Sequence, residues 1–172
     1  MSEAAQILAL LGTGEPIARD DVRRWTESQE LEVLGAVYEL TRNAWDRIQP
    51  ELEAVEFTNF MRRYLIRCID EDPRPGDHVH GGYEAAWELA GLLKHWRTLG
   101  KESKEILRRA AADLTVLYRR TDETTRNRIL CGVLEHAFEE PELRPYFASW
   151  QRDPDLREAY KLALDWGSTH EH

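Results

Sequence analysis

The chain has 172 residues, of which 42% are hydrophobic and 32% charged, and its formal net charge is −9 at pH 7. This composition excludes a disordered or fibrous chain and is typical of one globular domain. No apolar run reaches the roughly 20 residues that a membrane-spanning helix requires, and the acidic N-terminus lacks the basic segment of a signal peptide. We therefore expect a cytoplasmic protein with no membrane partner and no cofactor.

The first half of the chain reads as a series of helices with clear interruptions. Thr26 and Gln29 have the spacing of a capping box before the helix that contains LEVLGAVYEL. Pro50 separates this helix from the next, because proline breaks the helical hydrogen-bond pattern. Residues 51–71 place their apolar side chains on one helical face. The sequence EDPRPG at residues 71–76 then predicts the end of that helix.

The second half continues in the same way. A helix should begin near Tyr83 and end before Gly100, since glycine is favoured just after a helix. Residues 102–120 repeat the helical spacing, and Asp122 is placed to cap the helix that follows. Proline at the first helical position predicts that a last helix starts at Pro154. The helix after Asp122 carries a broad apolar stripe, made of Ile129, Leu130, Val133, Leu134, Ala137 and Phe138.

Helical periods without strand-like alternation predict an all-α fold. We expect a single domain over residues 1–172, built from about seven to nine antiparallel helices joined by short connections. Within it, residues 1–26 should form short helices, residues 27–166 the main helical core, and residues 167–172 a tail. An irregular bundle and HEAT-like stacked hairpins both fit this pattern.

Acidic residues concentrate in residues 27–56, called the acidic segment below, which holds eight acids and only two bases. Folding does not require this crowding, because like charges on neighbouring helical turns repel weakly. We therefore expect a surface that attracts a basic protein, while a solvated helix face is the alternative. The expected contacts are Glu27, Glu30, Glu32 and Glu39. Residues 91–128 hold ten bases against five acids, which keeps nucleic acid open as a less favoured partner.

Half of the six histidines lie between residues 74 and 96. His78, His80 and Glu84 could converge on a metal ion, but a structural zinc site would need a fourth ligand from elsewhere. Loop residues exposed to solvent are the simpler interpretation, and no metal site is predicted. Because loop tips often carry recognition, His78, His80 and Tyr83 are expected partner contacts as well.

No other motif indicates catalysis, so we expect the protein not to be an enzyme. The sequence contains no HExxH and no GxSxG, and its glycine-rich GTGEP lacks the lysine of a phosphate-binding loop. Cys68 and Cys131 are expected to be buried thiols rather than nucleophiles. Trp87 lies inside a predicted helix and is expected in the core.

Three stretches of the sequence resemble a known group of proteins. They are YEAAWEL at residues 83–89, RILCGVLEHAFEEPELRPYF at residues 128–147 and LALDWG at residues 162–167. These stretches are similar to parts of small bacterial helical proteins, several families of which are immunity proteins of polymorphic-toxin systems. The resemblance covers the chain from residue 57 onward. It implies a helical, cytoplasmic, non-enzymatic protein that binds a toxin, and it assigns no functional residue, because no catalytic motif defines these families.

These observations lead to one main hypothesis and two alternatives. The main hypothesis is an immunity-type inhibitor that occludes a protein partner, with acidic side chains that steer a basic toxin domain. The first alternative is a metal-dependent helical enzyme that uses His78, His80 and Glu84. The second is a regulatory or nucleic-acid-associated adaptor that uses the basic stretch from Lys94 to Arg128.

Overall fold

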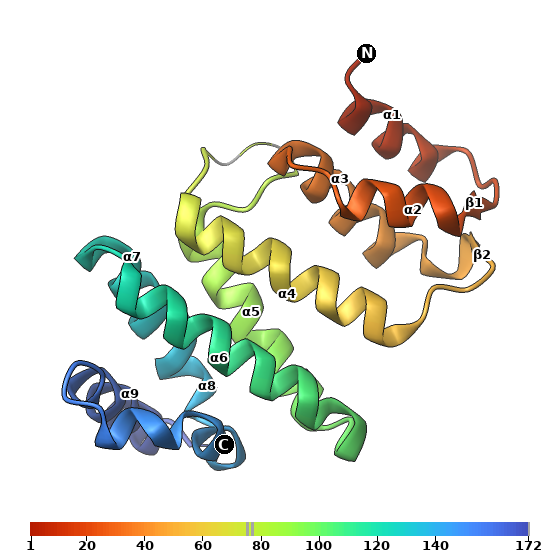
Figure 1. The fold of residues 1–172 in the computed structure, drawn as a ribbon. Helices are drawn as coiled ribbons and strands as arrows, with labels where there is room; N and C mark the ends of the chain where they lie inside the picture. Colours follow the sequence, from red (N-terminus) through yellow and green to blue (C-terminus); the bar gives the residue numbers. More distant parts are fainter. Residues whose placement is uncertain (75, 77, 172) are drawn as a thin grey trace. The chain divides into compact units, whose positions relative to one another are not determined.

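The computed structural model describes residues 1–74, 76 and 78–171 (Figure 1). These residues form nine α-helices, several 3-10 or π segments and one pair of two-residue parallel strands. The predicted all-α class is therefore confirmed. None of the described helices combines the length and the apolarity needed to cross a membrane. Contacts divide the chain into two compact units, residues 1–64 with 73–81 and residues 65–72 with 82–171.

Unit 1 is organised around a central, largely buried helix, α3. Its elements are α1 (Glu3–Ala9), β1 (Ile17–Ala18), α2 (Arg19–Thr26), α3 (Leu31–Asn43), β2 (Ile48–Gln49) and the first part of α4 (Ala54–Glu71). Helices α1 and α2 both pack on α3, so the N-terminal helices belong to the same core. The side chain of Arg47 fixes the chain between α1 and β1, because it donates to the carbonyls of Leu10 and Glu15, both at 2.7 Å.

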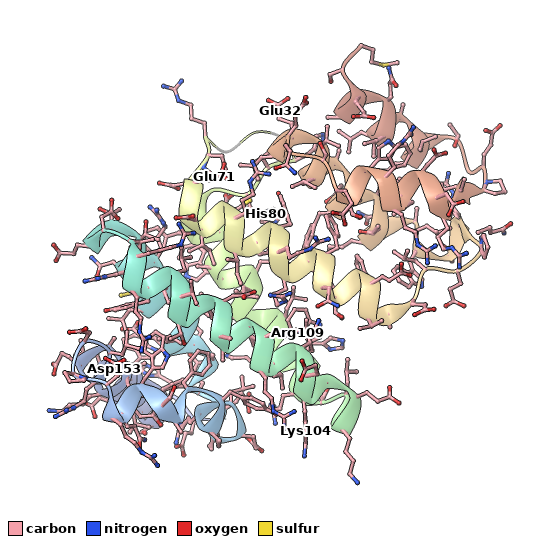
Figure 2. All side chains as sticks on the ribbon, viewed as in Figure 1. Glu32, Glu71, His80, Lys104, Arg109 and Asp153 are labelled. Atoms are coloured by element: carbon pink, nitrogen blue, oxygen red, sulfur yellow. The ribbon has the colours of Figure 1, made fainter. Side chains whose placement is uncertain are left out.

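Unit 2 contains the remaining helices and begins with the last turns of α4. Its elements are α5 (Gly82–Arg97), α6 (Lys104–Arg120), α7 (Glu123–Asn127), a π-helical segment (Arg128–Leu134), α8 (Glu135–Ala137), a 3-10 segment (Pro141–Arg152) and α9 (Arg157–Thr169). Helix α5 packs against α6, the π segment and α8. Figure 2 shows Lys104 extending from the first turn of α6. Trp96, Leu114, Phe138 and Trp150 are almost completely buried in this unit.

A buried arginine joins the end of α4 to the start of α5. Arg128 donates to the Ile69 carbonyl at 3.0 Å, to the Asp72 carboxylate at 3.0 Å and to the Thr125 hydroxyl at 2.8 Å. Asp72 also accepts the backbone N–H of Gly82 at 2.8 Å. These bonds satisfy a buried guanidinium, which would otherwise be costly to desolvate. They hold residues 72 and 82 together within unit 2.

Two local predictions are confirmed and one is wrong. Helix α5 begins at Gly82, next to the predicted Tyr83, and the Asp122 carboxylate caps α7 by accepting the Thr125 N–H at 2.9 Å. That bond lowers the pKa of Asp122, because it favours the charged carboxylate. Thr26 does not cap α3, because its hydroxyl donates to a carbonyl within α2, at Arg23. Helix α9 continues through residue 169, into the range expected to form the tail.

Two side chains predicted in the core are exposed. The burial of Cys68 is confirmed, but Cys131 is exposed, in a segment that is π-helical and therefore does not follow the α-helical period of the predicted stripe. Trp87 is 55% exposed. The buried positions of α5 follow a 3.6-residue period, and Trp87 falls between them; they are Gly82, Ala85, Ala86, Leu89, Ala90, Leu93 and Trp96.

Candidate partner-binding site

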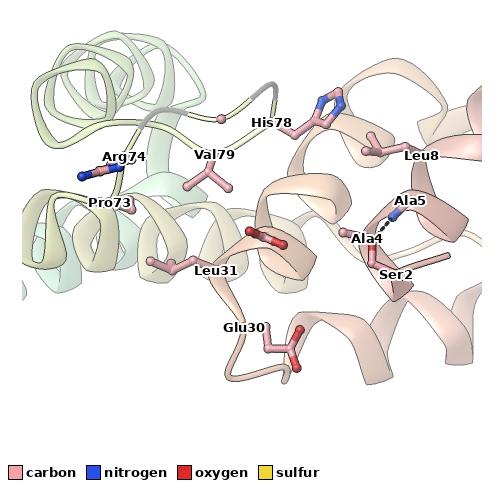
Figure 3. A pocket seen from close by; sticks show the side chains of 12 residues that line it. Ser2, Ala4, Ala5, Leu8, Glu30, Leu31, Pro73, Arg74, His78 and Val79 are labelled. Atoms are coloured by element: carbon pink, nitrogen blue, oxygen red, sulfur yellow. Dashed lines mark hydrogen bonds between the residues drawn. The ribbon is translucent and has the colours of Figure 1, made fainter.

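A pocket of about 730 Å³ opens in unit 1 between α1, the start of α3 and the loop of residues 73–79 (Figure 3). We call it the α1–α3 pocket. Its apolar lining comes from Ala4, Ala5, Leu8, Leu31, Pro73 and Val79, and its polar lining from Ser2, Glu30, Glu32, Arg74 and His78. An apolar floor with a polar rim is the usual make-up of a binding site. Three predicted partner contacts, Glu30, Glu32 and His78, meet here.

The ends of two helices position these side chains. Ser2 caps α1, since its hydroxyl accepts the Ala5 N–H at 3.2 Å, and this fixes the helix end that borders the pocket. Glu30 is the N-cap residue of α3, and its carboxylate is exposed. Glu32 lies in the first turn of the same helix, where a carboxylate is favourable because of the helix dipole. Within the described part of the chain, neither carboxylate has an ion-pair partner.

Other acids of the acidic segment are used within the fold. Glu27 pairs with Arg63 at 3.1 Å. Glu56 accepts two hydrogen bonds from Arg23, at 2.8 and 3.1 Å, and this guanidinium lowers the pKa of the Glu56 carboxyl. Glu39 accepts the side-chain amide of Asn43 at 2.8 Å and does not line the α1–α3 pocket. The structure therefore separates Glu30 and Glu32 from the partnered Glu27 and Glu39.

The two predicted loop histidines have different environments. His78 is exposed at the rim of the pocket, as expected. His80 is only half-exposed, which corrects the expectation that it is a solvated loop residue. Its ring lies against Tyr38 and Tyr64, with centroids 5.2 and 5.6 Å away, and its Nδ1 is 3.0 Å from the Tyr64 hydroxyl. The Tyr64 hydroxyl also accepts the His80 backbone N–H at 3.2 Å. His80 therefore anchors the loop through Tyr64.

This difference predicts unequal effects of two alanine substitutions. His80→Ala should lower the free energy of unfolding by about 1–2 kcal/mol, because it removes a hydrogen bond and two aromatic contacts. His78→Ala should change it by no more than about 0.5 kcal/mol, as is usual for an exposed side chain. Urea denaturation followed by circular dichroism measures both. Equal effects of the two substitutions would show that the Tyr64 contact does not hold the loop.

Tyr83 belongs to unit 2, in the first turn of α5, and its side chain is 43% exposed. Its ring lies 6.1 Å from that of Trp87, so the two exposed aromatic rings are neighbours. Within unit 2, Tyr83 is therefore available for contact, and it is not among the residues that line the α1–α3 pocket.

The basic stretch from Lys94 to Arg128 is largely neutralised within unit 2. Seven of its ten bases form ion pairs among the described residues, namely Lys94–Glu139, Arg97–Glu140, Arg108–Glu105, Arg109–Glu105, Arg119–Asp153, Arg120–Asp70 and Arg128–Asp72. Phosphate binding requires basic groups that are free to neutralise the backbone charge. This arrangement gives no support to the nucleic-acid alternative.

The described residues also give no support to a metal centre. Among them, no group of three or more histidine, cysteine, aspartate or glutamate side chains is arranged so that it could hold a metal ion. The Nδ1 of His80 is at hydrogen-bond distance from Tyr64. No family of proteins, no curated protein and no solved structure matches the chain.

Proposed function

We propose that the protein is a non-enzymatic interaction protein of the immunity type, which acts in the cytoplasm of a bacterium by binding and occluding a basic protein partner. The observation that carries this proposal is the α1–α3 pocket, where two carboxylates that form no ion pair among the described residues border apolar side chains. The pocket fits an apolar side chain of the partner with a lysine or arginine next to it. Its acids would steer the encounter, and the apolar contact would slow dissociation.

The floor of the pocket is suited to an anchor side chain. Leu8 and Leu31 are only partly buried, and Val79 closes the pocket from the loop side (Figure 3). Binding energy in protein interfaces concentrates in apolar anchors that become fully desolvated, with polar groups around them that exclude water. Glu30, Glu32 and His78 provide such a rim. Partly exposed leucines beside acidic groups therefore favour a partner segment that is both apolar and basic.

The partner can be captured through the pocket itself. A photo-crosslinking phenylalanine analogue at Leu31 should trap the partner in the source cells, whereas the same analogue at Leu162, exposed on α9, should not. The immunity-type role further requires that the captured protein is toxic when produced alone and harmless when produced together with this chain. A captured protein without toxicity would contradict the immunity role, and equal capture at both positions would contradict the site.

Charge reversal at the pocket gives the quantitative prediction. Glu30→Lys combined with Glu32→Lys should slow association with the captured partner by about tenfold or more at low salt, because rim charges act mainly on the association rate. The loss should shrink as salt rises, since added ions screen exposed charges. Surface plasmon resonance at several salt concentrations measures this dependence.

A matched control separates the pocket from the general acidity of the segment. Glu51→Lys combined with Glu53→Lys makes the same change of charge in exposed residues of the acidic segment that do not line the pocket. We expect a clearly smaller effect. An equal loss in both double variants would mean that the whole acidic surface steers the partner and that the pocket is not the contact. An unchanged association rate in the pocket variant would place the contact elsewhere.

A further inference from the structure

One glycine of α5 occupies a helix interior without any packing reason in the described part of the chain. At the helical positions Gly35, Gly132 and Gly167, an added Cβ would collide with His78, Ala86 and Phe138, respectively. Gly91 is different, because it is exposed and an added Cβ would meet nothing within 4 Å. A glycine inside a helix costs about 1 kcal/mol relative to alanine. The open space above Gly91 therefore suggests that something outside this chain approaches the helix closely there.

The residues around Gly91 form a hole of the kind that helices use to pack together. Trp87, Ala90, Gly91 and Lys94 occupy positions i, i+3, i+4 and i+7 of α5, the four positions that surround an inserted side chain in knobs-into-holes packing. With His136 at one side, they line a pocket of about 240 Å³. Small-molecule sites usually have volumes of about 300–1,000 Å³. The hole is therefore suited to one side chain from another helix.

The same face of α5 also carries a side chain that could fill such a hole. Trp87 is 55% exposed, and Tyr83 stands one turn before it. A two-fold symmetric contact between identical chains uses the same surface on both copies. That surface must therefore carry both a protruding side chain and a hole that accepts the same side chain of the other copy. The α5 face is thus self-complementary in shape.

We propose that two copies of this chain associate through antiparallel α5 helices, with Trp87 of each copy inserted beside Gly91 of the other. In this register the residue three positions before Trp87 faces the residue three positions after Gly91. Glu84 of one copy then lies opposite Lys94 of the other, and Tyr83 lies opposite His95. Glu84 precedes Trp87 and Lys94 follows Gly91, so the antiparallel arrangement pairs this carboxylate with this ammonium, while Glu88 lies close to the two-fold axis.

The contact that Lys94 makes inside each copy is compatible with this pairing. Lys94 bonds to the Glu139 carboxylate, which fixes its ammonium at the edge of the hole. An ammonium has three donor protons, so Lys94 can also bond to a second carboxylate. Exposed ion pairs add little affinity, and one helix pair buries less than the roughly 1,200 Å² of a standard interface. The expected product is a weak, reversible dimer.

The purified chain alone tests the contact, by sedimentation velocity over a concentration series from low micromolar to near-millimolar. The wild type should change from monomer to dimer across this series. Gly91→Leu should remain monomeric, because its side chain fills the hole, and its melting temperature should not fall, because leucine is the better helix former. Trp87→Ala should also remain monomeric, since it lacks the inserted group. Trp166→Ala, which removes an exposed aromatic ring from α9, should dimerise like the wild type.

Two results would overturn the proposed contact. A wild type that stays monomeric at the highest concentration would show that α5 does not bind a second copy. A Gly91→Leu variant that dimerises as strongly as the wild type would show that any dimer uses another surface. Neither result bears on the α1–α3 pocket, because none of the substituted residues lines it.

Discussion

Replacing Trp150 by alanine is expected to lower the free energy of unfolding by about 3–5 kcal/mol, the usual cost of removing a large aromatic side chain from a core. Trp150 has no exposed surface. Its ring centroid lies 5.2 Å from that of Tyr118 and 5.8 Å from that of Phe147. Its Nε1–H donates to the Thr115 hydroxyl at 2.7 Å. The substitution therefore leaves a cavity and removes a buried hydrogen bond.

Urea denaturation followed by far-ultraviolet circular dichroism measures the loss, and Trp87→Ala is the control. Because Trp87 is more than half exposed, its removal should change the free energy of unfolding by no more than about 0.5 kcal/mol. Trp150→Phe should fall between the two, because it keeps a ring but loses the bond to Thr115. Similar losses for Trp150→Ala and Trp87→Ala would contradict the burial that separates them.

The two tryptophans also show how far the sequence predicts the fold. Helical spacing correctly identifies α5 as a helix, and its apolar stripe passes through Leu89, Leu93 and Trp96. Trp87 lies off that stripe, so its exposure could be predicted from the spacing even though its hydrophobicity suggests burial. The same test fails for Cys131, which is exposed although it precedes the buried Phe138 by seven residues, because residues 128–134 form a π-helix with a different period. The pair of two-residue strands could not be predicted, because two residues carry no alternation.

The sequence indicates single residues of the candidate site, but it does not predict that they come together in a pocket. Local charge indicates Glu30 and Glu32, and a loop position indicates His78. Their convergence depends on the return of residues 73–81 to α3, which is fixed by contacts far apart in the sequence, such as that between Tyr64 and His80. No local pattern identifies the apolar lining either, because Leu8 and Leu31 look like ordinary helix residues. The sequence also places Gly91 inside a predicted helix, where glycine is unfavourable and usually has a packing or functional reason. The structure shows that no packing contact within the described residues explains this glycine.

Replacing Gly35 by alanine is expected to destabilise the protein by about 1–3 kcal/mol, the usual cost of forcing extra volume into a packed site. Helix propensity alone predicts the opposite sign, because alanine is better than glycine inside a helix by about 1 kcal/mol. The unfavourable packing should outweigh the gain in helix propensity. An added Cβ would lie far inside contact distance of the His78 carbonyl oxygen, 3.0 Å from the His78 carbonyl carbon and 3.1 Å from the Tyr64 hydroxyl oxygen. Backbone atoms cannot turn aside as the end of a long side chain can, so residues 78–80 would have to move.

Gly91→Ala is the matched control, since it makes the same chemical change in an open position and should raise the stability of the monomer by about 1 kcal/mol. Urea denaturation at a protein concentration low enough to keep the chain monomeric measures the free energy of unfolding of both variants. We expect this free energy to fall for Gly35→Ala and to rise for Gly91→Ala. Hydrogen exchange adds a local measurement: Gly35→Ala should speed the exchange of the His80 amide, which donates to Tyr64, and leave the amides of α6 unchanged. The displaced loop should also weaken partner binding at the α1–α3 pocket, because His78 and Val79 line it. A Gly35→Ala variant that is as stable as Gly91→Ala would show that α3 and this loop do not approach each other so closely.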